Sequence, residues 1–91
     1  MANSLIGPVW SVDTASATAL TRLTVRLHGV RWVSKTATAG DDATIKDLNG
    51  NVIWKSVASG TNYREADSPR RVCSGLVVDE LDSGTLYLEI D

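Results

Sequence analysis

The chain has 91 residues, of which 43% are hydrophobic and 22% are charged, and its formal net charge is −2 at pH 7. This composition excludes a chain that is disordered for lack of apolar residues, and the weak negative charge disfavours a general nucleic-acid binder. Cys73 is the only cysteine, so an intrachain disulfide is excluded. The length fits one small domain, which we expect packing or partners to stabilise.

The first twenty residues are nearly uncharged and become rich in small side chains after Asp13. They lack a basic start and contain Pro8, so we expect no secretory signal and a mature, unprocessed protein. No run approaches the about 20 apolar residues of a membrane-spanning helix, and we expect no membrane partner. We predict an N-terminal arm or edge strand over 1–19 and a β-sandwich domain over 20–91. The first segment is either an edge strand of the same domain or an arm laid across a neighbouring subunit.

From Leu20 onward, apolar and polar residues alternate with the period of a strand that buries one face. The residues expected on the buried face are Leu23, Val25 and Leu27, and those on the polar face are Arg22, Thr24, Arg26 and His28. After Gly29, the apolar residues Val30 and Trp32 continue on even positions. This change of phase predicts a bulge or bend at Gly29. Arg31 extends the basic row that Arg22 and Arg26 begin.

An Asn49-Gly50 pair between two short apolar segments predicts a β-hairpin with strands at about 43–47 and 51–57. Two turns compete. A three-residue loop with Gly50 in the left-handed position sets Ile45 opposite Ile53 and Asp47 opposite Asn51, whereas a two-residue loop sets Ile45 opposite Trp54. We prefer the three-residue loop.

Residues 58–71 lack a clear period and contain Gly60, Asn62 and Pro69, so we expect a long loop there. Strands are predicted over 72–78 and 85–90, with a turn at 82–84. In the last strand Leu86, Leu88 and Ile90 alternate with outward-facing residues that include Tyr87. About seven short strands without a convincing helix predict an all-β fold, either a small antiparallel β-sandwich or a jelly-roll-like barrel.

No catalytic constellation is recognisable in the sequence, and we expect no enzyme. His28 is the only histidine and belongs to the polar face, while Cys73 lies in an apolar run, so no nucleophile and base are paired. Phosphate-cradling glycine motifs are absent, and we expect no cofactor.

Metal ligands are also not expected. The run Asp47-x-Asn49-x-Asn51 resembles the start of a calcium loop but lacks the required glycine and glutamate, so turn chemistry explains it. A second acidic group, which contains Asp79, Glu80 and Asp82, is read as a solvated hairpin end in preference to a calcium site, and Asp41 and Asp42 carry the same weak signal.

Several residues are candidates for contact with other proteins. Six of the nine basic residues are arginine, which suits bidentate pairing with carboxylates at interfaces. We prefer protein contact to nucleic-acid contact for them, and a merely solvated face is the third alternative. Tyrosine in a loop combines apolar area with a polar tip. The candidate contact residues are Leu5, Ile6, Trp10, Tyr63, Arg64, Arg70 and Arg71.

Over roughly residues 20–90 the chain resembles small all-β proteins encoded among the virion structural genes of tailed bacteriophages. The segments that carry the resemblance are GVRWV at 29–33, AGDD at 39–42 and KDLNGNVIW at 46–54. It implies a capsid decoration or cement protein that binds and stabilises an assembled shell. The implied partner is the major capsid protein or another virion protein, and the implied location is the outer capsid surface after synthesis in the host cytoplasm. We expect a homo-oligomer, a dimer or a trimer.

A second function remains open at this stage, namely a carbohydrate- or receptor-binding β-sandwich module, including one on a phage tail. In that case Trp54 and Tyr63 would serve as stacking platforms beside acidic loops.

Overall fold

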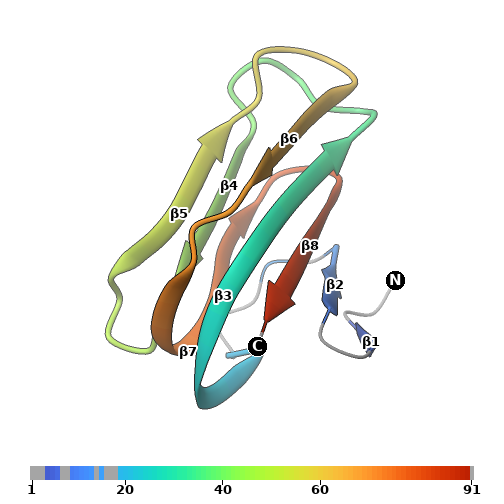
Figure 1. The fold of residues 1–91 in the computed structure, drawn as a ribbon. Helices are drawn as coiled ribbons and strands as arrows, with labels where there is room; N and C mark the ends of the chain where they lie inside the picture. The colour runs from blue at the N-terminus through green and yellow to red at the C-terminus, as the bar shows by residue number, and fades with distance from the viewer. Residues whose placement is uncertain (1–3, 7–8, 14, 16–18, 91) are drawn as a thin grey trace.

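The computed structural model describes residues 4–6, 9–13, 15 and 19–90, and their regular structure is entirely β (Figure 1). The eight strands of this part are β1 (Ser4–Ile6), β2 (Val9–Val12), β3 (Thr21–Ser34), β4 (Asp42–Lys46), β5 (Val52–Val57), β6 (Tyr63–Asp67), β7 (Arg71–Leu81) and β8 (Thr85–Ile90). They pair antiparallel in one open sheet of order β1-β2-β8-β3-β7-β4-β5, with β6 attached to β3. The predicted all-β class is confirmed.

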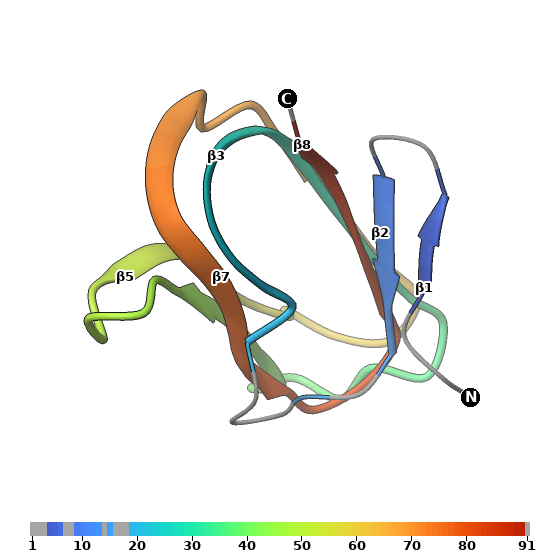
Figure 2. The same ribbon diagram turned by 90° about the horizontal axis from the view of Figure 1, so that it is seen from below.

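The sheet curls because its two longest strands bend, as Figure 2 shows for β3 and β7. The first half of β3 pairs with β7, while its second half lies between β6 and β8. The pairing with β8 shifts by one residue between Leu27 and Gly29, which leaves His28 as the extra residue of a bulge. The irregularity expected at Gly29 is therefore confirmed, within one continuous strand.

The concave side of the curled sheet holds the core, in which β3, β4, β7 and β8 contribute most of the large side chains. Those with essentially no exposed surface include Trp32, Leu27, Ile45, Leu76, Leu86, Leu88, Val12 and Val78. Each buried aliphatic or aromatic side chain of this size contributes about 1.5–3 kcal/mol relative to an exposed one.

Leu23 is not part of this core, and its prediction as a buried residue is wrong. Its side chain is 73% exposed. The β3–β7 ladder shifts register between Thr21 and Thr24. Side chains alternate between the two faces with period two, so the alternation that buries Leu27 does not continue through this shift to Leu23.

The β4–β5 hairpin combines features of both predicted turns. The Asp47 N–H donates to the Asn51 carbonyl at 3.0 Å, and the Gly50 N–H donates to the Asp47 carbonyl at 3.2 Å, so the loop has the preferred three residues. Gly50 has the left-handed φ of 83° that this turn requires. The ladder then shifts by one residue and Ile45 lies opposite Trp54, so the expected pairing with Ile53 is wrong.

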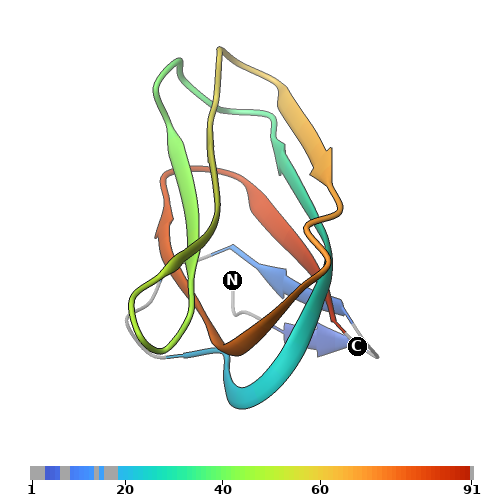
Figure 3. The ribbon, with the colours of Figure 1, turned by 60° about the vertical axis from the view of Figure 1, so that its left-hand side comes forward.

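Residues 58–71 are not one long loop, because they contain β6. This strand pairs with Val30–Ser34 of β3 and runs almost directly into β7. Its sequence, YREAD, has no apolar alternation, and its backbone partners come from β3. Arg70, between β6 and β7, has a positive φ of 52°. Figure 3 shows β3 and β6 on the side of the molecule opposite the β4–β5 hairpin.

The N-terminal strands extend the same sheet beyond β8. β2 pairs with β8 from Val9 opposite Glu89 to Val12 opposite Leu86, and β1 pairs with β2. The described residues of segment 1–19 thus include two strands at the edge of this sheet, which corresponds to the edge-strand alternative.

Candidate functional site

The strands β5 and β6 meet through side chains and share no backbone ladder, and we call their junction the seam. The Trp54 indole N–H donates to Asp67 Oδ2 at 2.8 Å. The Ser56 hydroxyl and the Tyr63 hydroxyl both donate to Glu65 Oε1, each at 2.6 Å. The Tyr63 ring also packs edge-on against Trp32, with centroids 5.3 Å apart.

The hydrogen bonds of the seam shift the pKa values of two of its groups. Hydrogen bonding with the Glu65 carboxyl, and secondly with the Trp54 indole, lowers the pKa of Asp67. Donation to Glu65 is the main cause that raises the pKa of the Tyr63 phenol. Both carboxylates are thus held by donors from neighbouring residues, an arrangement that fastens β5 to β6.

The alternation of β6 separates its charges between two faces. Tyr63, Glu65 and Asp67 turn toward the seam, where their hydrogen bonds lie. Arg64 and Ala66 occupy the intervening positions, are exposed and project from the opposite face. The carboxylates of this strand therefore accept hydrogen bonds at the seam, with Asp67 still exposed, and its arginine projects from the opposite face.

Arg64 and Ala66 belong to a surface that continues across β3 to β8. In the β3–β6 ladder Val33 lies opposite Arg64 and Arg31 opposite Ala66. In the β3–β8 ladder Arg31 lies opposite Tyr87. We call these five residues, Arg31, Val33, Arg64, Ala66 and Tyr87, the outer face.

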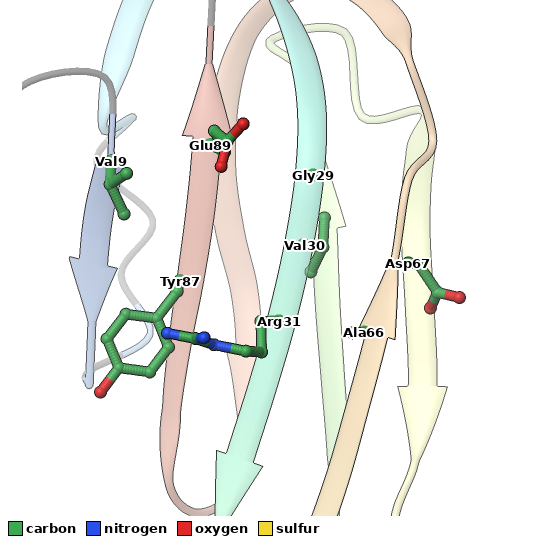
Figure 4. Close-up of a pocket in the computed structure, with 8 residues that line it drawn as sticks. All are labelled: Val9, Gly29, Val30, Arg31, Ala66, Asp67, Tyr87 and Glu89. Atoms are coloured by element: carbon green, nitrogen blue, oxygen red, sulfur yellow. The ribbon is translucent and has the colours of Figure 1, made fainter.

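Two hollows lie on the outer face and share Arg31 and Ala66 in their lining. The first has a volume of about 260 Å³ and extends past Gly29 to Val9 and Glu89. The second has a volume of about 380 Å³ and lies over Val33, Arg64 and Glu65. Gly29 leaves the first hollow open, because it places no side chain between the strands (Figure 4).

Among the described residues, the arginines of the outer face have no acidic partner. The Arg31 guanidinium lies over the Tyr87 ring, 4.7 Å from its centroid, as Figure 4 shows. In the described part of the chain no carboxylate forms an ion pair with Arg31 or Arg64. The carboxylate of Glu89 is instead 3.9 Å from His28 Nε2. A guanidinium stacked on an aromatic ring keeps N–H donors for a planar anion.

The structure separates the residues that the sequence singled out for contact. Arg64 is on the outer face, whereas Tyr63 lies in β6 with its hydroxyl on Glu65, so the expectation of an exposed loop tyrosine is wrong. Trp10 packs against the core. Arg70 is exposed between β6 and β7, and Arg71, exposed at the start of β7, donates to the Ile53 carbonyl. Leu5 and Ile6 lie in β1, but their side chains are outside the described residues.

An acidic group brings together Asp42, Glu80 and Asp82, whose nearest carboxylate oxygens lie within 4.8 Å of one another. Asp79, which the sequence grouped with two of them, pairs with Lys46 at 3.1 Å. One oxygen of Asp82 accepts the Asp42 N–H at 2.7 Å, and the Asp82 N–H donates to the Asp42 carbonyl. These bonds fasten the β7–β8 turn to β4.

The single cysteine is buried, as expected, and desolvation raises the pKa of its thiol. Cys73 lies opposite Val25 in the β3–β7 ladder, whereas His28 lies at the bulge beside β8.

Sequence reasoning noticed Arg31 and Tyr87 separately and missed Gly29 and Ala66 as parts of one surface. The signal available for β6 was that the tyrosine and the two acidic residues of YREAD occupy alternate positions, as residues on one face of a strand do. The pairing of Arg31 with Tyr87 depends on the bulge at His28, which sets the register of β8.

Comparisons with known proteins found no match among family models, curated proteins or solved structures. The described part of the chain has no helix long and apolar enough to cross a membrane.

Proposed function

We propose that this protein is a non-enzymatic virion structural protein, a decoration or cement protein that binds an assembled phage shell through the outer face. The observation that carries the proposal is the position of Arg31 and Arg64, which are exposed on one face and pair with no carboxylate in the part of the chain that the structure describes. Arginines beside apolar and aromatic groups are typical of protein interfaces. The resemblance of segments 29–33, 39–42 and 46–54 to virion structural proteins supplies the class of partner.

The mechanism is thermodynamic linkage. A protein that binds the assembled shell but not its separate subunits stabilises the assembly by mass action. A dimer or trimer that touches several shell subunits adds avidity, because its second contact forms at high effective concentration. No group on the outer face needs to change covalently in this process.

The carbohydrate-binding alternative loses the platforms on which it was based. The Trp54 side chain is only 8% exposed, and the Tyr63 ring packs on Trp32 inside the seam. The remaining aromatic ring of the outer face, Tyr87, carries the Arg31 guanidinium on one side. A sugar would need to displace this cation to stack there.

Fractionation of native source material on a density gradient tests the proposal, with the protein followed by mass spectrometry. We expect stoichiometric co-migration with large particles that survives moderate salt. A double variant, R31A with R64A, should no longer co-migrate with the particles, whereas R26A, on the other half of β3, should stay bound. Recovery of the wild-type protein solely at low mass would overturn the proposal.

A further inference from the structure

We infer that the outer face binds an acidic polypeptide segment in extended conformation, whose carboxylates pair with Arg31 and Arg64. This inference rests on the proposed function and names the chemistry of the partner. It starts from the directions of the charged groups of β6, because the carboxylates of Glu65 and Asp67 accept hydrogen bonds at the seam, whereas Arg64 projects from the other face. Among the residues that the structure describes, neither arginine has a carboxylate partner, and both can pair with carboxylates of another chain.

The spacing of the two arginines fits an extended peptide. Arg31 lies opposite Ala66, and Arg64 is two residues before Ala66 on β6, so the arginines are diagonal neighbours on one face. Such neighbours are about 7–8 Å apart in a sheet. Side chains at alternate positions of a strand are about 6.6–6.8 Å apart and point the same way. Carboxylates two residues apart therefore match the pair.

The surface between the arginines suits the body of a peptide better than a polyphosphate. Val33 and Ala66 give it an apolar floor, and two acidic residues, Asp67 and Glu89, line the hollow beyond Arg31, where they limit the length of an acidic segment. A nucleic acid presents a phosphate at every nucleotide and is held by many basic groups, whereas this face offers two in a chain of net charge −2. Because arginine pairs bidentately with carboxylates, an acidic peptide fits the outer face better than a nucleic acid does.

The hollow at Gly29 provides a way to block the face without breaking the fold. A Cβ at Gly29 would lie 3.7 Å from the Glu89 Cβ and 3.8 Å from the Asp67 carbonyl oxygen, both ordinary contacts. The residue has no left-handed φ. Alanine therefore fits the strand there, and we expect valine, a residue that strands favour, to place its methyl groups in the hollow beside Arg31.

The test measures binding of a fluorescent eight-residue peptide, blocked at both ends, in which glutamate and threonine alternate. The control peptide carries glutamine in place of glutamate. We expect the acidic peptide to bind and the control not to bind. R31A and R64A should each weaken binding about tenfold, the effect of losing one charge-assisted pair. R26A, on an exposed position of the same strand, should change it less than about twofold, since a distant surface charge acts weakly.

Two further arms make the result decisive. G29V should weaken peptide binding while its thermal midpoint stays at or above that of the wild type. A single-stranded oligonucleotide of equal charge should bind more weakly than the acidic peptide. Equal losses in R26A and R31A, or tighter binding of the oligonucleotide, would overturn the inference.

The particle assay separates this inference from the proposed function. Peptide binding that depends on Arg31, without co-migration with particles, supports the inference and overturns the shell-binding proposal. Co-migration that R31A and R64A leave unchanged, together with absent peptide binding, overturns the inference and leaves shell binding to another surface.

Discussion

Trp54 on β5 donates its indole N–H to Asp67 on β6 across 2.8 Å, and this bond joins two strands that have no backbone pairing with each other. β5 pairs with β4 and β6 pairs with β3, so the seam depends on side chains. Its stability is therefore open to direct test by single substitutions.

Asp67→Ala removes the acceptor and leaves the indole N–H of a buried tryptophan without a partner. We expect a loss of about 1–2 kcal/mol in the free energy of unfolding, in the range for an unsatisfied buried donor. Asp67→Asn keeps an acceptor oxygen and should lose less. Urea unfolding measures both, and Asp79→Ala on β7, which removes a partly exposed ion pair with Lys46, serves as the control for loss of a surface carboxylate. Equal stability of Asp67→Ala and the wild type would show that the seam does not need this bond.

Acid should weaken the seam. The pKa of Asp67 is below its ordinary value of 3.8 in the folded protein. A carboxyl whose folded pKa is lowered stabilises the fold fully above its unfolded pKa, and this contribution disappears as the pH falls through the folded pKa. The thermal midpoint, measured from pH 6 to pH 2, should therefore decrease once the pH is below about 4. Asp67→Asn should show a shallower fall than the wild type, and parallel curves would contradict the assignment.

Tyr63 should make the fold less stable as the pH rises, the reverse of the pH dependence expected from Asp67. Its phenol pKa is raised above 10.0, mainly by the bond that it donates to Glu65. A phenol with a raised folded pKa contributes stability that is present below the unfolded pKa and is lost as the pH rises through the folded pKa. Tyr63→Phe should unfold more easily than the wild type at pH 8 and show less additional loss above pH 10. Circular dichroism during thermal unfolding provides the measurement, and identical profiles would rule out this role.

Gly84→Ala should destabilise the fold strongly. Gly84 has a φ of 77°, and a Cβ there would collide with the Val33 carbonyl oxygen and with Ser34. Because the obstacles include backbone, the turn must shift, and we expect a loss above about 2 kcal/mol. Gly60→Ala is the matched control, since nothing lies within 4 Å of the added atom. Chemical unfolding of the two variants should separate them clearly, and comparable midpoints would contradict the expectation.

Cys73 should resist modification in the folded state. Its side chain is 4% exposed, and burial raises the pKa of the thiol, so little reactive thiolate forms at neutral pH. A thiol reagent such as dithionitrobenzoate should react slowly with native protein and rapidly in concentrated urea. Fast reaction of the native protein would indicate that β7 opens locally.

Regular alternation made much of the fold predictable. Leu86 and Leu88 are buried as their period predicts, and the change of phase at Gly29 marks a real bulge. Leu23 and Ile53 were misplaced because each lies beside a register shift that depends on the partner strand. β6 was missed because its inward residues are polar and satisfied by hydrogen bonds, a pattern that hydrophobic periodicity does not register.

The candidate site was only partly accessible from the sequence. Arg31, Arg64 and Tyr87 were each noticed, but their common face results from pairings between strands far apart in the chain, since Arg31 lies opposite both Ala66 and Tyr87. Such nonlocal register follows from the whole set of ladders, which no local pattern specifies.

The place of β8 in the sheet also determines when the protein can fold. β8 lies between β2 and β3, so the β1–β2 pair can join the rest of the sheet only after β8 has left the ribosome. Until then one edge of β2 and one edge of β3 have no partner, and unpaired edges are prone to aggregate. Closure of the sheet therefore waits for its last strand, and the order of synthesis leaves these two edges exposed until β8 joins them.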